Sequence, residues 1–205
     1  MDKGSLKLYL VTDSALAGDR NIEDIVREAV EGGVTMVQLR EKGLDTRQFI
    51  ERAKKLKEIL HGVPLIINDR VDVALASDAD GVHLGQSDMP CTTARQILGP
   101  DKIIGLSVEN REQIIEANTL DVDYIGISPV FATPTKTDTA APFGLDGLRE
   151  AAEISKHPTV AIGGMNAGTA GEVFAAGADG IAVVSAIVCA PDPRKAAEEL
   201  IEIAK

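Results

Sequence analysis

Short aliphatic runs of the kind that form buried strands recur along the chain and alternate with helical patterns, and this alternation limits the fold more than any other feature. Between the first two runs, the spacing of Ile22, Ile25 and Val26 follows the i, i+3, i+4 rule that lines one face of a helix. Strands that alternate with helices indicate a parallel sheet with helical crossovers. Eight runs follow this rhythm, at residues 7–11, 35–39, 64–67, 81–84, 102–106, 123–127, 159–162 and 180–184.

Residues that begin and end helices lie between these runs. Asn21 is placed to cap the first long helix. Asp45 with Gln48 three residues later predicts a capping box, and an Asp-Pro pair at 192–193 predicts the start of the last helix. Glycines that predict helix ends are Gly32, Gly99 and Gly177.

Two architectures fit this pattern, an open doubly wound sheet and a closed barrel. Eight units in 205 residues favour the barrel. The first run is not followed by a GxGxxG or P-loop lysine motif, which weakens the dinucleotide-binding alternative. The Ala-Asp-Gly segment at 79–81 recurs at 178–180, so strand entries are reused. We predict a single (β/α)₈ TIM-barrel domain over residues 1–205.

Charge and cysteine content exclude several classes of function. The formal net charge is −11, from 21 Lys+Arg against 32 Asp+Glu, which disfavours nucleic acid and anionic membranes as partners. Cys91 and Cys189 are too isolated for a disulfide framework or a zinc site. The apolar stretch near the start is too short for a signal peptide or a membrane span. We therefore expect a cytoplasmic, soluble protein.

The residues that follow the predicted strands are unusually rich in chemistry. In a (β/α)₈ barrel, active sites are built at the C-terminal ends of the strands, so these residues would face one mouth. They are Gln38, Arg40, Glu41, Lys42, Asn68, Asp69, Arg70, Gly85, Gln86, Asp88, Ser107, residues 131–138, Gly163, Gly164 and Ser185.

Two kinds of anion site are predicted at this mouth. Gly163-Gly164 and Ser185 follow the last two strands, where barrels commonly hold a phosphate, although the glycines could also serve only a tight turn. Cations from two other loops suit a more highly charged anion such as a diphosphate, although most surface charges are simply solvated. These cations are Arg40, Lys42 and Lys136.

Asp69 and Asp88 add a predicted Mg²⁺ site beside the cations, because Mg²⁺ favours a few carboxylates together with substrate oxygens and water. Asp69 could instead cap the helix that begins near Val71, and Asp88 could be a solvated loop residue. His83 lies inside a strand-like run, and we expect it to be packed or hydrogen-bonded rather than a general base. The segment 130–144 is long for a barrel loop and fits a lid or a tolerated insertion.

Five ordered motifs resemble those of the thiamin phosphate synthase family, and the resemblance runs from the first strand to Ser185 and beyond. The motifs are Gln38-Leu39-Arg40-Glu41-Lys42, Asn68-Asp69-Arg70, Gly81-Val82-His83-Leu84-Gly85-Gln86 with Asp88, Thr133-Pro134-Thr135-Lys136 and Ile162-Gly163-Gly164.

The resemblance implies a Mg²⁺-dependent transferase that joins 4-amino-2-methyl-5-pyrimidinylmethyl diphosphate to 4-methyl-5-(2-phosphoethyl)thiazole and releases diphosphate. It places the pyrimidine diphosphate on Gln38, Leu39, Arg40, Glu41, Lys42, Asn68, Ser107 and Lys136, and the metal on Asp69 and Asp88. It places the thiazole phosphate on Thr133, Pro134, Thr135, Gly164, Val184 and Ser185. The catalytic residues it implies are Arg40, Lys42, Ser107 and Lys136. Relatives also suggest a homo-oligomer.

Two other functions remain open at this point. A thiazole tautomerase on the same scaffold is not expected to keep the full set of cations and acids found here. A phosphate-binding sensor without catalysis would also use the scaffold, since fold does not fix function, but the sequence shows no regulatory or DNA-binding segment beside the predicted barrel.

Overall fold

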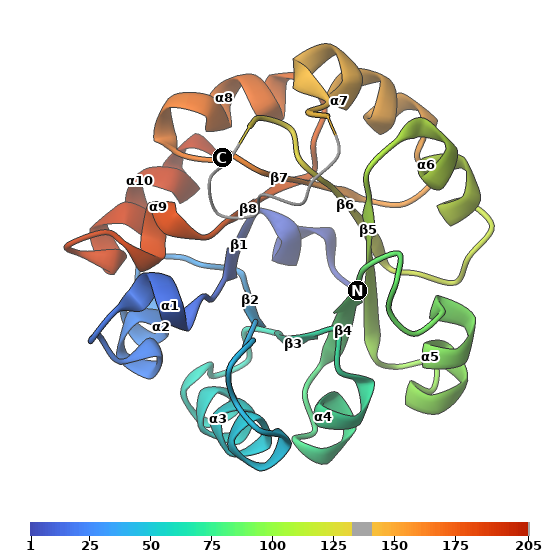
Figure 1. The fold of residues 1–205 in the computed structure, drawn as a ribbon. Helices are drawn as coiled ribbons and strands as arrows, with labels where there is room; N and C mark the ends of the chain where they lie inside the picture. Colours follow the sequence, from blue (N-terminus) through green and yellow to red (C-terminus); the bar gives the residue numbers. More distant parts are fainter. Residues whose placement is uncertain (133–140, 205) are drawn as a thin grey trace.

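Eight parallel strands close into one barrel in the order β1 to β8, as the computed structural model shows for residues 1–132 and 141–204 (Figure 1). Each strand pairs in parallel with its neighbours along the chain, and β8 closes the ring against β1. The predicted (β/α)₈ barrel is therefore confirmed and the open sheet is excluded. The strands are β1 (Leu8–Val11), β2 (Met36–Leu39), β3 (Leu65–Asn68), β4 (Gly81–Leu84), β5 (Ile103–Val108), β6 (Tyr124–Ile127), β7 (Thr159–Ile162) and β8 (Gly180–Val183).

The α-helices surround the barrel on its outside (Figure 1). Asn21 caps α2, Asp45 and Gln48 form the predicted capping box of α3, and Asp192 caps α10 with a proline in its first turn. The helices are the 3-10 helix η1 (Lys3–Leu6), then α1 (Ser14–Ala17), α2 (Ile22–Glu31), α3 (Thr46–Ile59), α4 (Val71–Ala76), α5 (Cys91–Leu98), α6 (Arg111–Ala117), α7 (Gly144–Ile154), α8 (Ala167–Ala175), α9 (Ser185–Val188) and α10 (Pro193–Ile203). None of the helices in the described ranges has the length and apolarity needed to cross a bilayer.

The core has two layers because strand side chains alternate between the two faces of the sheet. Leu8, Leu10 and Leu39 point outward and pack with the apolar faces of the helices. Tyr9 and Met36 belong to a smaller cluster inside the barrel. Both faces are buried, which explains why the strands read as continuous apolar runs.

The repeated Ala-Asp-Gly segment has a structural role at the N-terminal end of the barrel. Side chains just before the even-numbered strands accept hydrogen bonds from backbone N–H groups at the start of the preceding strand. The four bonds are Leu8 N to Thr35 Oγ1 at 2.9 Å, Leu65 N to Asp80 Oδ2 at 2.8 Å, Ile104 N to Asp123 Oδ2 at 2.9 Å and Thr159 N to Asp179 Oδ2 at 2.8 Å. These residues therefore satisfy strand-end donors far from the mouth.

Candidate active site

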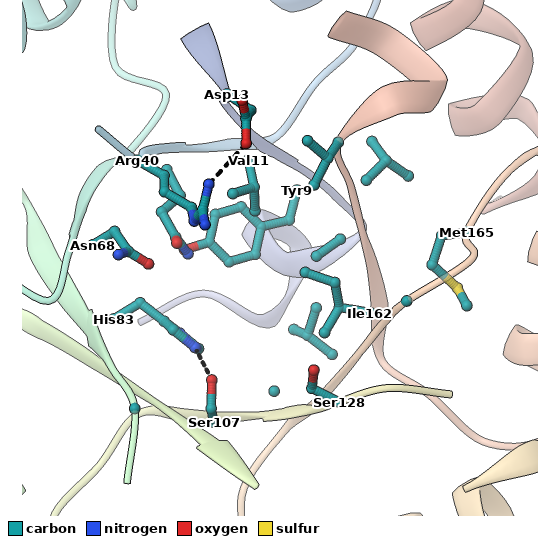
Figure 2. A pocket seen from close by; sticks show the side chains of 18 of the residues that line it. Tyr9, Val11, Asp13, Arg40, Asn68, His83, Ser107, Ser128, Ile162 and Met165 are labelled. Carbon is teal, nitrogen blue, oxygen red and sulfur yellow. Dashed lines mark hydrogen bonds and ion pairs between the residues drawn. The ribbon is translucent and has the colours of Figure 1, made fainter. Parts of the chain in front are cut away.

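A cavity of about 850 Å³ opens at the C-terminal end of the barrel, within the size range of small-molecule sites. Every strand contributes to its wall, and most of the predicted site residues meet there. Figure 2 labels three of them, Arg40, Asn68 and Ser107. Predicted residues that line it are Gln38, Arg40, Lys42, Asn68, Asp69, Gly85, Gln86, Asp88, Ser107, Gly163, Gly164, Val184 and Ser185.

The floor of the cavity is a series of hydrogen-bonded polar side chains, buried or half-buried, from five strands. Gln38 Nε2 donates to the Tyr9 hydroxyl at 2.8 Å, and the hydroxyls of Tyr9 and Tyr124 lie 2.8 Å apart. The Tyr124 hydroxyl lies 2.9 Å from His83 Nδ1. His83 Nε2 in turn lies 2.8 Å from Ser107 Oγ (Figure 2). The prediction that His83 is a hydrogen-bonded histidine is confirmed.

Burial keeps the hydrogen-bonded side chains of the cavity floor in their neutral forms. Burial lowers the pKa of His83 to about 4, although the charge of Asp69 acts in the opposite direction. Burial also raises the pKa of Tyr9 and Tyr124 above the usual value for tyrosine. At neutral pH the floor is therefore uncharged. No local sequence signal distinguishes the two tyrosines, which look like ordinary members of aliphatic runs.

Two predicted residues lie one step deeper than expected. Asn68 is the last residue of β3, and Ser107 lies inside β5, where it pairs with Gly126. The sequence predicts both after their strands, because the apolar run stops before each of them. Polar side chains continue these strands because they face the cavity rather than the apolar layer.

The β2 side of the mouth carries two of the predicted cations, Arg40 and Lys42. Arg40 Nη1 lies 2.8 Å from Asp13 Oδ2 (Figure 2), and the Arg40 backbone N–H donates to Thr12 Oγ1. Lys42 Nζ lies 2.9 Å from Asp69 Oδ2. Both cations line the cavity, so they are placed to meet an anion although each already has a carboxylate partner.

Asp69 and Asp88 bring two carboxylates to the ends of β3 and β4. Asp69 has a left-handed backbone, with φ of 62°, which is uncommon for a residue other than glycine. It does not cap α4, whose N-cap is Arg70 without a side-chain hydrogen bond, so the capping alternative is wrong. Asp88 Oδ2 accepts from the Gly85 N–H at 2.7 Å and is therefore a tethered residue, not a freely solvated one.

The electrostatics of this pair suit a cation. Burial raises the pKa of Asp88, and Asp69 raises it further, whereas the Gly85 hydrogen bond and Lys42 lower it. The described residues hold no cluster of three or more His, Cys, Asp or Glu side chains that could bind a metal. Two carboxylates fit Mg²⁺ only if substrate oxygens and water supply its other ligands, as is common for this ion.

The side chains of Leu39 and Glu41, both predicted to bind the pyrimidine diphosphate, do not line the cavity. Leu39 is fully buried in the outer layer of the core. Glu41 Oε1 lies 2.6 Å from Arg52 Nη1 and accepts from Ser14 Oγ at 2.7 Å. Alternation along and beyond β2 explains this, since Gln38 and Arg40 take the inward positions.

The Gly163-Gly164 turn lies on the opposite side of the mouth. Both residues have positive φ, 100° and 72°, so glycine is required by the turn. A Cβ on Gly163 would lie 2.7 Å from Pro129 Cβ, and one on Gly164 would lie 2.9 Å from Phe131 Cβ. Both glycines also line the cavity, together with Val184 and with Ser185, which begins α9. The backbone of the turn therefore requires glycine at both positions. Both glycines also leave the backbone accessible from the cavity.

Some site residues fall outside the prediction or outside the described structure. Thr133, Pro134, Thr135 and Lys136 lie outside the described residues, as does the rest of the predicted lid between residues 133 and 140. Glu109, Ser128 and Asn166 line the cavity and were not predicted. They lie shortly after β5, β6 and β7, so the rule that directs attention to strand ends could have found them.

Comparisons with known proteins agree with this site. The family model described as thiamine monophosphate synthase matches residues 8–187. A thiamine-phosphate synthase of Albidiferax ferrireducens is 57% identical over 201 residues, which cover 97% of this chain and 92% of that protein. One of Vibrio campbellii is 59% identical over 199 residues, which cover 95% and 96%.

A solved structure extends the agreement to three dimensions. The thiamine phosphate pyrophosphorylase of Pyrococcus furiosus superimposes with a TM-score of 0.91 at 45% identity, covering 98% of this chain and 96% of that one. Fold, cavity and sequence thus lead to the same family, and the resemblance noted in the motifs is confirmed. This chain belongs to the thiamine monophosphate synthase family.

Proposed function

We propose that this transferase joins 4-amino-2-methyl-5-pyrimidinylmethyl diphosphate to 4-methyl-5-(2-phosphoethyl)thiazole in the barrel cavity, giving thiamin phosphate and diphosphate. One observation carries the proposal: a single cavity has cations and carboxylates on the β2 to β4 side and a glycine turn with Ser185 on the β7 to β8 side. Two phosphorylated substrates would meet between these sides, each with its own anion site.

The diphosphate belongs on the β2 to β4 side. Arg40 and Lys42 would bind its oxygens, with Lys136 as a third cation from the loop after β6. Asp69 and Asp88 would hold Mg²⁺ against the same oxygens. When bound, Mg²⁺ would neutralise charge that develops on the departing diphosphate. Gln38, Asn68 and Ser107 line the deeper part of the cavity and would hold the pyrimidine end.

The thiazole phosphate belongs on the β7 to β8 side. The backbone N–H groups of Gly164 and Ser185 are suited to phosphate oxygens, because glycine allows close approach. Val184 would contact the apolar part of the ligand. Thr133, Pro134 and Thr135 would complete the site from the loop after β6. The proposed pose directs the thiazole nitrogen toward the pyrimidine methylene carbon, which lies between the two anion sites.

The chain's contribution is positioning and electrostatics rather than covalent chemistry. Loss of diphosphate leaves a methylene cation that the electron-rich aminopyrimidine stabilises, and the thiazole nitrogen then captures it. The described floor of the cavity is uncharged at neutral pH, since burial keeps His83 neutral at a pKa of about 4, and so it places no cation next to that carbon. Held geometry and oriented charges supply the rate enhancement.

The test is a product assay with purified protein, both substrates and Mg²⁺. We expect equal amounts of thiamin phosphate and diphosphate, with turnover lost when Mg²⁺ is chelated and restored when it is added back. Arg40→Ala should raise the KM for the pyrimidine diphosphate, whereas Arg47→Ala, on the surface helix α3, is the matched control. Formation of a thiazole isomer without thiamin phosphate would contradict the proposal and favour a tautomerase.

A further inference from the structure

The hydrogen bonds on the cavity floor form a continuous series, and each donor in it points toward the same end of the series. It runs from Gln38 through Tyr9, Tyr124 and His83 to Ser107, in steps of 2.8 to 2.9 Å. Tyr9 is 1% exposed and Tyr124 is fully buried. Each hydroxyl has one hydrogen to donate, so the choice made at one link limits the next.

The direction follows from counting hydrogens. An amide nitrogen donates and does not accept, so Gln38 Nε2 uses the Tyr9 oxygen as its acceptor. The hydrogen of Tyr9 then has one acceptor among the described residues, the Tyr124 oxygen. Tyr124 in turn donates to His83 Nδ1. With Gln38 Nε2 facing Tyr9, the opposite direction would leave the buried Tyr9 hydrogen without an acceptor, which folded proteins rarely tolerate.

This direction selects one tautomer of His83. With Nδ1 as an acceptor, the neutral ring carries its hydrogen on Nε2 and donates it to Ser107 Oγ. Ser107 Oγ has no other hydrogen-bond partner within the described ranges, so its own hydrogen is directed to the cavity that it lines. At the other end, the side-chain oxygen Oε1 of Gln38 is also without a partner among the described residues.

We propose that Tyr9, Tyr124 and His83 are positioning residues that hold Ser107 as a donor and Gln38 as an acceptor toward the bound pyrimidine diphosphate. The inference rests on the function proposed above. A ligand that fits must offer an acceptor, such as a phosphate oxygen or a ring nitrogen, to Ser107 and an N–H donor, such as an amino group, to Gln38. The hydrogen-bonded series thereby links two ligand-binding groups, Gln38 on β2 and Ser107 on β5.

Nitrogen-15 NMR of the histidine rings tests the direction without any substrate. The chain has three histidines, and His157 serves as an internal reference because its Nε2 meets the Ala117 carbonyl oxygen and must donate. We expect His83 to show the same Nε2-protonated tautomer as His157, with its signal identified by its loss in His83→Gln. An Nδ1-protonated His83 would overturn the proposal whether or not the enzyme makes thiamin phosphate.

A double-mutant cycle tests whether Tyr124 acts through Ser107. Tyr124→Phe should lower kcat/KM for the pyrimidine diphosphate about tenfold in the parent protein, the size of one well-placed hydrogen bond. In a Ser107→Ala background, the same change should lower it less than twofold, because the group that Tyr124 orients is gone. Equal losses in both backgrounds, or no loss in the parent, would show that Tyr124 has only a packing role.

Tyr9→Phe is the matched control, since it also deletes one tyrosine hydroxyl, and Tyr9 and Tyr124 belong to the same buried cluster. In the proposed direction, Tyr124 still donates to His83 after this change, so the His83 tautomer and Ser107 are retained. Its effect should therefore be equal in the Ser107→Ala and parent backgrounds. If Tyr124→Phe does not fold, His83→Gln in the same two backgrounds replaces it, with the same expected loss of effect. A parent protein that forms no product would refute the proposed function and leave the NMR result to decide the direction.

Discussion

Substitutions of Asp88 can separate its contribution to stability from its contribution to turnover. Its carboxylate accepts from the Gly85 N–H at 2.7 Å and lies beside Asp69. Asp88→Asn keeps an oxygen that can accept this hydrogen bond but removes the charge. Asp88→Ala removes both. The two variants therefore share the loss of the proposed metal ligand and differ in one backbone hydrogen bond.

The expected magnitudes follow from these contacts. Without Mg²⁺, Asp88→Asn should unfold at the parent temperature or slightly above it, because it relieves the burial and like-charge costs that raise the pKa of Asp88. Asp88→Ala leaves the Gly85 N–H without its acceptor at a part-exposed site, which costs about 1 kcal/mol. For a protein of this size, that cost lowers the unfolding temperature by about 2–4 °C.

Activity should respond differently from stability. With one of two carboxylates gone, both variants should lose about a hundredfold or more in turnover, equivalent to about 3 kcal/mol of transition-state stabilisation. Thermal unfolding without Mg²⁺ and product formation across a Mg²⁺ titration measure the two effects. Turnover of Asp88→Asn within tenfold of the parent at saturating Mg²⁺ would refute the metal role of Asp88. Equal unfolding temperatures for the two variants would refute the role of the Gly85 hydrogen bond.

Three further predictions concern the glycine turn, the cavity floor and the N-terminal end of the barrel. Gly163→Ala should destabilise the protein by roughly 2–5 kcal/mol, from a positive φ and a Cβ only 2.7 Å from Pro129 Cβ, as denaturant unfolding would reveal. Because the pKa of His83 is depressed to about 4, stability should fall as the pH drops from about 6.5 toward 4. This loss is at most about 3 kcal/mol, and it should be smaller in His83→Gln over the same pH series. Asp123→Ala removes the acceptor of the Ile104 N–H and should cost about 1–3 kcal/mol, with turnover at low temperature unchanged because the site lies at the opposite end of the barrel.

Much of this protein can be predicted from its sequence because the signals are local. The alternation of apolar runs with helical patterns indicates a βα repeat, and the order of polar residues after each run identifies the mouth. Capping residues such as Asn21 and Asp45 act within a few positions of themselves, so their roles are visible without a structure. The ordered motifs also indicate the family and thereby the substrates.

Tertiary structure decided the features that depend on contacts across the barrel. Tyr9 and Tyr124 are 115 positions apart in sequence, and nothing near either residue indicates that the barrel brings their hydroxyls together. The direction in which Leu39 and Glu41 point, and the tether between Asp88 and Gly85, likewise depend on how the strands close and the loops turn. A strand pattern predicts which residues approach the mouth, but only closure of the sheet determines which side chains share the cavity and which hydrogen bonds connect them.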